Sequence, residues 1–472
     1  MADEALQKST SGNGLKNLNK KMETFKVLVL FSFWLCVCHA ATGPTHGKVV
    51  VCYVGTWAVY RPGSGLFDVE HIDPTLCTHL IYSFAGLNIE TDSIKSLDPY
   101  QDLTENYGKG GFNRFVRLKD RYPHLKVSIA IGGWTQGSTN YSIMASDPQR
   151  RSRFVRSVLE FIKKHNFDGL DLDWEFPGKR GGAPHDKANF LLLVKELRAA
   201  FTKNNYLLTA ALGAGKDTID IAYDVAGLSV YLDFIHMMCY DYHGDWDKKT
   251  GPNAPLKGQD ALTIEYTINY MLQLGAEPSK LVLGLPLYGR TFTTKEENVF
   301  TKEKPRLGVE SEAAGFPGPF TRENGFMGYN EICLELKNNS DFWTIHWDDV
   351  SRTPFAIGGD KVIVYDNPRS ISEKVKFAME KNLGGCMVWS MDTDDFRGDC
   401  SSMEGEMFEN YPLLRTINKV IEISLEDIKR SKENEIPDDR KEKSSSSRTL
   451  GASLLTVGLT IINAVIFNKF MF

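Results

Sequence analysis

The sequence predicts one large α/β domain folded as a (β/α)8 barrel, with a separate insertion before its last strand. Eight apolar runs alternate with segments that have the spacing of amphipathic helices, which favours a parallel sheet covered by helices. Acidic and aromatic residues gather at the ends of these runs, where barrels of this kind carry their functional side chains. The length of 472 residues accommodates one such barrel with appendages.

The predicted strands follow one another at regular intervals. They are expected at 48–55, 78–87, 126–134, 169–175, 207–212, 234–241, 281–288 and 385–391. Between the third and the fourth, Asp147 and Pro148 begin an amphipathic stretch that ends at His165-Asn166, which indicates a capped helix. A second such stretch follows the fourth strand, with apolar residues at Phe190, Val194, Leu197 and Phe201.

The interval between the last two strands is much longer than the others. Residues 291–357 are rich in Gly, Pro and aromatic residues, and a structureless loop of that length is improbable in a compact domain. An inserted subdomain is therefore predicted. Its aromatic residues Phe342, Trp343 and Trp347 are interpreted as core packing in preference to ligand contact.

The segment 167–178, FDGLDLDWEFPG, carries the clearest chemical signal. Alternate residues of a strand share a face, so Asp171, Asp173 and Glu175 are expected on one face and the apolar residues between them on the other. Acidic residues on a strand are usually solvated, but the flanking helices predict a strand covered on both faces. Crowded carboxyls cannot all ionise, so one of them holds a proton at raised pKa, as a general acid must. Glu175 is the candidate.

This motif fits the DxxDxDxE signature of family 18 glycoside hydrolases, and residues 48–414 resemble the catalytic domain of animal and insect chitinases. Further blocks resembling that family occur in order: VCYVGTW at 51–57, YSFAG at 82–86, IGGW at 131–134, MMCYDYHG at 237–244, GLPLYGR at 284–290 and GGCMVWS at 384–390. The resemblance implies a (β/α)8 barrel with an α+β insertion that walls one side of a substrate groove.

The resemblance also implies an activity and residue roles. The reaction is hydrolysis of β-1,4 linkages between N-acetylglucosamine units of chitin and chitooligosaccharides, with retention, in which the 2-acetamido group of the sugar attacks. Glu175 is implied as acid and base, and Asp173 as the stabiliser of the positive charge that develops on the acetamide. Asp171 shares the proton balance, while Tyr240 and Asp241 orient the acetamido group and the distorted sugar. No cofactor is expected.

Aromatic residues at strand ends are candidates for sugar contact, because the apolar face of a pyranose stacks on an indole. Trp389 is expected to form the floor beneath the reacting sugar. The other candidates for lining the groove are Tyr53, Trp57, Phe84, Trp134, Met238, Trp246, Tyr288 and Arg290. Taken singly, most buried aromatic residues belong to the core, but their places at strand ends favour contact for Trp57, Trp134 and Trp389.

One departure from the family pattern affects specificity. The family often continues Gly-Gly-Trp with Asn and an aromatic residue, whereas Thr135-Gln136 follow here, so contacts on the leaving-group side are expected to differ.

Two rival functions share the fold or the motif. A chitinase-like lectin keeps the groove but typically loses the acid, and a glycosidase acting on N-glycans shares the acid motif. Retention of Asp171, Asp173, Glu175 and Tyr240, together with the other matching blocks, favours a chitinase over both rivals. Endo action is the mode expected of it, although these residues do not choose between endo and exo attack.

The chain contains eight cysteines, of which Cys36 and Cys38 lie in an apolar segment expected to be removed. The other six allow up to fifteen pairings in a secreted chain, so spacing alone does not choose among them. The resemblance implies disulfides Cys52–Cys77 and Cys333–Cys400, which leaves Cys239 and Cys386 as buried free thiols. No Cys/His spacing suggests a metal site.

The ends of the chain differ from its middle. Residues 1–21 form a polar extension and 22–41 resemble a secretory signal peptide, with an uncleaved anchor as the alternative. The barrel domain is expected at 42–424 and a charged, Ser-rich linker at 425–449. A separate Cys-rich chitin-binding module is not expected after the barrel. Residues 450–472 fit a lipid-anchor signal or a single membrane-spanning helix. The domain is therefore expected on the outer face of the plasma membrane, or released from it.

The charge and the N-glycan sequons bear on partners and modification. The net charge is −5 and Lys and Arg form no stripe, which argues against a nucleic-acid partner. A monomer is expected. Asn140 and Asn338 begin sequons for N-glycans, which the predicted secretory route makes usable.

Overall fold

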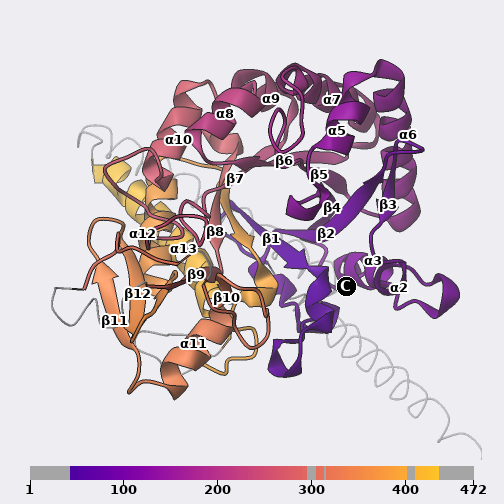
Figure 1. The fold of residues 1–472 in the computed structure, drawn as a ribbon. Coiled ribbons are helices and arrows are strands. Elements are labelled where there is room, and N and C mark those ends of the chain that lie inside the picture. Colours follow the sequence, from indigo (N-terminus) through magenta and orange to yellow (C-terminus); the bar gives the residue numbers. More distant parts are fainter. Residues whose placement is uncertain (1–42, 295–304, 313–314, 401–409, 435–472) are drawn as a thin grey trace, which may run out of the picture. The chain divides into compact units, whose positions relative to one another are not determined.

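A closed parallel barrel forms the centre of the fold in the computed structural model, which describes residues 43–294, 305–312, 315–400 and 410–434 (Figure 1). Its eight strands are β1 (Val49–Gly55), β2 (His79–Asn88), β4 (Lys126–Gly132), β5 (Gly169–Asp173), β6 (Leu207–Gly213), β7 (Phe234–Met238), β8 (Leu281–Pro286) and β14 (Gly385–Trp389). Strand β1 pairs in parallel with both β14 and β2, which closes the sheet. The predicted (β/α)8 barrel is confirmed.

Several strands end before the predicted limits. β5 stops at Asp173, which pairs with Gly132 as the last pair of that ladder, and β7 stops at Met238. Glu175 and Tyr240 therefore lie two residues beyond their strands. The strand predicted at 169–175 is therefore too long, and the loop after β5 sets the position of Glu175, which still interacts with Asp173 as expected.

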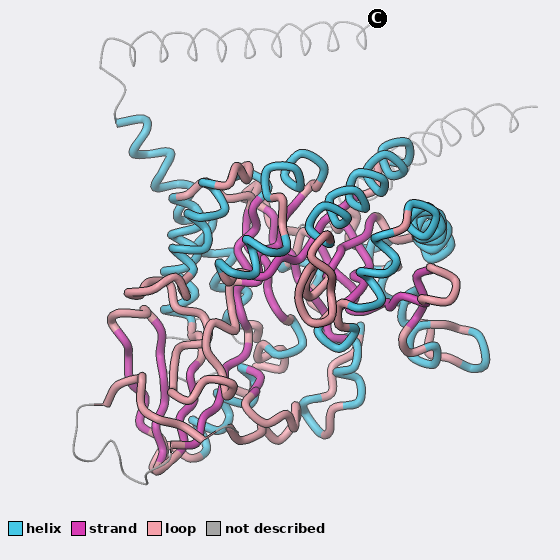
Figure 2. The backbone as a smooth tube through the Cα atoms, turned by 45° about the horizontal axis from the view of Figure 1, so that its top comes forward, coloured by secondary structure: helices cyan, strands magenta, loops and turns pink. Residues whose placement is uncertain are grey.

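Helices cover the outside of the barrel (Figures 1 and 2). The two predicted helices are confirmed as α6 (Pro148–His165) and α7 (Asp186–Phe201). The Asp147 side chain accepts from the N–H groups of Gln149 and Arg150 and so caps α6, as its sequence indicates. The others are α2 (Pro99–Asp102), α3 (Gly111–Val116), α4 (Leu118–Arg121), α5 (Thr139–Ser146), α8 (Lys216–Ala222), α9 (Val225–Tyr231), α10 (Ile264–Gln273) and α12 (Pro368–Glu380). The short strand β3 (Ser93–Ser96), which was not predicted, pairs antiparallel with β2.

The predicted insertion lies between β8 and β14. It contains β9 (Tyr288–Thr293), β10 (Phe326–Gly328), α11 (Tyr329–Asn338), β11 (Thr344–Asp348), β12 (Thr353–Gly358) and β13 (Lys361–Val364). These strands form an antiparallel sheet in the order β10-β9-β13-β12-β11. The insertion extends beyond 291–357 at both ends, because β9 begins at Tyr288 and Arg290 of β9 pairs with Val364 of β13. Trp343 is buried in it, in keeping with core packing, whereas Phe342 is exposed.

The C-terminal helix corrects the predicted linker. Helix α13 spans Pro412–Asn434, so residues 425–434 are helical instead of irregular. Arg430 forms ion pairs with Glu426 and Asp427 at helical spacings of four and three, which support a solvated helix at that end. The rest of the predicted linker lies outside the described residues.

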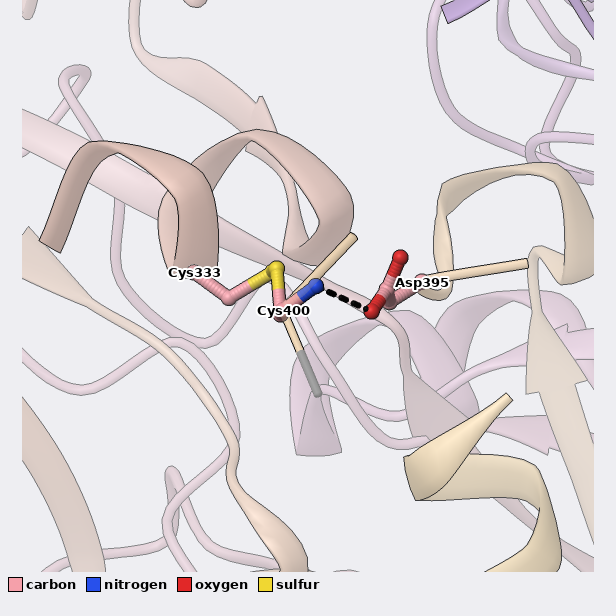
Figure 3. Close-up of side chains that lie close together, drawn as sticks. All are labelled: Cys333, Asp395 and Cys400. Atoms are coloured by element: carbon pink, nitrogen blue, oxygen red, sulfur yellow. Dashed lines mark hydrogen bonds between the residues drawn. A yellow bond between two sulfur atoms is a disulfide. The ribbon is translucent and has the colours of Figure 1, made fainter. Parts of the chain in front are cut away.

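Both disulfides implied by the resemblance are present: Cys52–Cys77 and Cys333–Cys400. Cys239 and Cys386 are buried and free, as expected. Figure 3 shows Asp395 beside the second disulfide, where its carboxylate accepts from the backbone N–H of Cys400 at 2.9 Å. Although these three side chains lie close together, sulfurs bonded to each other offer no thiolate to a metal. The disulfide and this hydrogen bond therefore hold the segment that follows β14 in place.

The predicted signal peptide at 22–41 and apolar C-terminal segment at 450–472 lie outside the described residues. Among the helices that the structure describes, none has both the length and the apolarity to cross a membrane. Asn140 and Asn338 of the two sequons are both exposed.

Candidate active site

Asp171 is fixed inside the barrel by residues from three other strands. Its side chain is fully buried, and its carboxylate accepts from Tyr53 Oη and Thr209 Oγ1, each at 2.6 Å. His236 Nδ1 lies 3.1 Å from Asp171 Oδ1 and 2.8 Å from Tyr53 Oη. These contacts immobilise Asp171 below the end of β5, where it contributes charge to the residues above it.

Asp173 is a buried carboxyl group with an oxygen that has no partner in the part of the chain that the structure describes. It is 3% exposed, and its Oδ1 has no hydrogen-bond partner among the described residues. Burial first, and then repulsion from Glu175 and Asp171, raise the pKa of Asp173 well above its ordinary value. A buried carboxyl oxygen without a partner is costly to the fold, so this atom is positioned to meet a donor that the protein does not itself supply.

Glu175 is a carboxylic acid poised near neutrality. Burial raises its pKa to about 7, the charge of Arg180 acts in the opposite direction, and Asp241 raises it further. Because Glu175 and Asp173 interact closely, their protons belong to the pair. The pair therefore holds a proton at neutral pH, which is the state that a general acid needs.

A second polar group follows β7 and is shared with the insertion. Asp241 Oδ1 accepts from Tyr288 Oη at 2.6 Å and from Arg290 Nη2 at 2.6 Å. Asn253 Oδ1 accepts from the Asp241 N–H at 3.0 Å, and Asn253 Nδ2 donates to the Tyr288 carbonyl at 3.2 Å. Burial raises the pKa of the neighbouring Tyr240, which keeps its hydroxyl protonated and able to donate.

Three aromatic rings form a continuous group beside the carboxyls. The Phe84 ring is stacked on Trp389 at a centroid distance of 5.7 Å and on Trp57 at 6.2 Å. Trp57 and Trp389 lie 6.1 Å apart, and Trp57 remains 45% exposed. Met238 and Tyr240 pack with Phe84 and Trp389 against the same part of the barrel core. This group offers ring surfaces to a ligand above the barrel.

Two further indoles are exposed, and an arginine covers each of them. Trp134 is 61% exposed with the Arg180 guanidinium 3.4 Å from its ring centroid. Trp246 is 54% exposed with Arg290 at 4.9 Å. Cation–π contacts of this kind hold an exposed ring in one orientation.

The structure thus brings the predicted site residues together toward the C-terminal ends of the strands. Two of them have a different role from the predicted contact with sugar, because they hydrogen-bond to carboxyl groups of the site. Tyr53 and Tyr288 are buried, and they hold Asp171 and Asp241 instead of presenting rings to a ligand.

Sequence reasoning missed His236, Thr209, Asn253 and Arg180. Alternation on β7 puts His236 on the same face as Met238, a signal that was available. Arg180 and Asn253 lie in loops, where no periodicity identifies them.

Carboxyls of raised pKa at the C-terminal ends of the strands of a (β/α)8 barrel, among exposed indoles, fit the class of barrel glycoside hydrolases. Residues 49–394 match the model of the glycosyl hydrolases family 18. The chain belongs to this family.

Named relatives agree with the family. The chain is 50% identical over 458 residues to "Probable chitinase 2" of Drosophila melanogaster, covering 91% of this chain and 92% of the relative. A solved structure of the Group IV chitinase of Ostrinia furnacalis, in complex with allosamidin, matches with a TM-score of 0.75 and 42% identity, over 80% of this chain and 99% of that one. Human YKL-39, described as a pseudo-chitinase with retained chitooligosaccharide binding, matches with a TM-score of 0.70 and 33% identity, over 79% of this chain and 99% of that one.

Proposed function

We propose that this protein is an active, endo-acting chitinase that hydrolyses β-1,4 linkages between N-acetylglucosamine units with retention of configuration. The observation that carries the proposal is the pairing of Glu175, whose pKa is about 7, with Asp173, whose buried Oδ1 lacks a partner. The Glu175 carboxyl can supply a proton, and the Asp173 Oδ1 can accept a hydrogen bond from a ligand. The acetamide N–H of the substrate is such a donor.

In the first step, the Glu175 carboxyl gives its proton to the glycosidic oxygen while the C1–O bond breaks. The carbonyl oxygen of the 2-acetamido group forms a new bond to C1, and positive charge develops on the resulting oxazolinium ring. Asp173 accepts from the acetamide N–H and stabilises this charge, while the Tyr240 hydroxyl orients the acetamide oxygen.

In the second step, the Glu175 carboxylate removes a proton from water, and the water oxygen attacks C1 as the oxazolinium ring opens. Two inversions at C1 give net retention. Glu175 ends the cycle protonated, so the site is ready for the next linkage.

The aromatic residues supply the binding energy. Trp389 is proposed as the floor under the reacting sugar, with Phe84 and Trp57 extending that surface. Attack within a chain, the endo mode, is supported by a relative named "Endochitinase" from Manduca sexta, 38% identical over 78% of this chain and 67% of the relative.

A lectin function is the second candidate, because the similar human YKL-39 is described as a pseudo-chitinase that binds chitooligosaccharides. The acid residue and its neighbours distinguish the two functions. This chain keeps Glu175, Asp173, Asp171 and Tyr240 in one group, which favours turnover over binding alone.

Two fluorogenic β-glycosides test the proposal, one of chitotriose and one of cellotriose, which carries hydroxyls in place of the acetamido groups. We expect release of the fluorophore from the chitotriose compound alone, because only that sugar carries the internal nucleophile. The first product seen by NMR is expected to be the β anomer. Comparable hydrolysis of both glycosides, or an α product, would refute the mechanism, and binding without any hydrolysis would favour the lectin.

We also propose that the protein enters the secretory pathway and acts outside the cell at a membrane. Two disulfides in the barrel domain support an oxidising destination. Treatment of expressing cells with a phosphatidylinositol-specific phospholipase distinguishes the two forms of attachment. Release into the medium is expected for a lipid anchor, retention indicates a spanning segment, and a chain confined to the cytosol would contradict the proposal.

A further inference from the structure

Arg180 links the acid to an exposed indole through three contacts. Its guanidinium carbon lies 3.4 Å from the centroid of the Trp134 ring. Its Nη1 donates to the carbonyl oxygen of Trp134 at 3.0 Å and to that of Glu175 at 3.0 Å. One side chain therefore fixes the ring of Trp134, the main chain that carries this ring, and the main chain that carries Glu175.

The loop that presents Arg180 is itself anchored. The buried carboxylate of Asp186 accepts from the N–H groups of Gly178 at 3.0 Å and Ala183 at 2.7 Å, on either side of Arg180. Ser142 of α5 donates to the same carboxylate at 2.7 Å. Arg180 has a φ of 50° and the next residue, Gly181, has a φ of 91°, so two left-handed residues turn the arginine back over Trp134.

The contact leaves Trp134 with one covered face and a large exposed area. Because an arginine side chain occupies one side of the indole while the residue is 61% exposed, the remaining ring surface faces solvent. In the proposed reaction the Glu175 carboxyl meets the glycosidic oxygen, and Arg180 ties the Trp134 ring to the main chain of the same residue, which makes this ring a candidate surface for the sugar that carries that oxygen. The Trp57, Phe84 and Trp389 rings form a separate group.

The charge of Arg180 has a second effect on the same residue. It lowers the pKa of Glu175 against the larger effect of burial. The other titratable groups that act on Glu175 or respond to it are Asp173 of β5, Asp241 after β7, Tyr240 and Tyr223. Among these groups Arg180 is the cation that acts on Glu175, whereas Arg290 pairs with Asp241.

We propose that Arg180 is a positioning residue that holds the Trp134 indole as a platform for N-acetylglucosamine units on the leaving-group side and aligns that platform with Glu175. This inference rests on the proposed function for the identity of the sugar and of the leaving side. The platform would increase the affinity for substrates long enough to place sugars on the leaving-group side, in addition to the chemistry at Glu175.

Two variants separate the roles of shape and charge. Arg180→Lys keeps the charge but loses the planar surface and the fork of donors, whereas Arg180→Gln also loses the charge. For Arg180→Lys we expect KM for chitohexaose to rise about fivefold, the loss of one cation–π contact. KM for a fluorogenic chitobioside, which places no sugar on the leaving-group side, is expected to change by less than about twofold. Arg180→Gln is expected to show the same split and to move the alkaline limb of the pH profile to higher pH, because the cation that lowers the pKa of Glu175 is gone.

A double-variant cycle tests whether Trp134 transmits the effect. In a Trp134→Ala background, Arg180→Lys should produce little further change in KM for chitohexaose, since the ring that it positions is absent. Arg117→Gln, which removes an exposed arginine elsewhere on the barrel, is the matched control for a general loss of positive charge. Melting temperatures of all variants identify any that are merely unfolded.

Binding provides a readout that does not depend on turnover. Calorimetric titration of chitohexaose into the Glu175→Gln protein, with and without Arg180→Lys, should show the same loss of about fivefold in affinity. A wild-type protein that binds but does not hydrolyse would refute the proposed function and leave this measurement valid. The inference about Arg180 is overturned if Arg180→Lys leaves both KM and Kd for chitohexaose unchanged, if it weakens both substrates equally, or if its effect persists in full without Trp134.

Discussion

Replacing Glu175 by Gln is expected to lower kcat for chitohexaose by about a thousandfold or more while oligosaccharide binding persists. The amide has the size of the acid but no proton to give to the glycosidic oxygen. Steady-state kinetics supply kcat, and calorimetry supplies affinity. Glu160→Gln, an exposed carboxyl on α6, is the control for loss of an acidic residue and should behave as the wild type.

The leaving group provides a sharper form of this prediction. A dinitrophenolate departs without protonation, so the Glu175→Gln protein should recover much of its first-step rate on a dinitrophenyl glycoside of chitobiose. An equally large loss on both substrates would show that Glu175 acts in some role other than proton donation to the leaving oxygen.

The pH profile follows from the same residue. Glu175 must be protonated in the first step and its pKa is about 7, so kcat/KM of the wild type should fall as pH rises through that region. The limb should disappear in Glu175→Gln assayed with the dinitrophenyl glycoside. A limb that stays in place would assign the titration to a different group.

Replacing Asp173 by Asn is expected to lower kcat by about a hundred- to a thousandfold. Unlike the loss in Glu175→Gln, this loss is expected on the dinitrophenyl glycoside as well. The side chain is buried and Asn has nearly the same shape, so packing changes little. The anion that stabilises the oxazolinium charge is lost. Because that charge develops whichever group leaves, the dinitrophenyl glycoside should not restore the rate.

This contrast separates the two carboxyls in one experiment. Rate constants for chitohexaose and for the activated glycoside are measured for Glu175→Gln and Asp173→Asn side by side. Recovery of the Asp173 variant on the activated substrate would mean that Asp173 only keeps Glu175 protonated, and the proposed stabilisation of the oxazolinium ion would be wrong.

Much of the barrel was predictable because its signals are local. Most of the barrel strands are apolar runs of ordinary strand length, and Asp147, Pro148 and an apolar stripe mark α6. Errors concentrate where local pattern ends. Several strands, such as β5 and β7, stop earlier than predicted, and α13 continues through a charged stretch that composition assigned to a linker.

The candidate site was predictable only in part, since its contacts join distant residues. Tyr53 and Asp171 are 118 positions apart, and their hydrogen bond exists only because the barrel closes. Asp241 and Arg290, 49 positions apart, meet because the insertion begins directly after β8. Alternation along a strand pointed to Glu175, but the strand ends at Asp173 and the loop after β5 sets the position of Glu175.

By itself the sequence determined the order of strands and helices, the acidic motif with its aromatic companions, and the resemblance that pairs four of the cysteines. Hydrophobic periodicity encodes the strands and helices within short windows, whereas the cysteine pairing was implied only by the family resemblance. Only the tertiary structure decided which carboxyl oxygen lacks a partner, which tyrosines support and which rings face outward, and that Arg180 covers Trp134. Those outcomes depend on loop conformation and on burial by residues from other strands, which no short window contains.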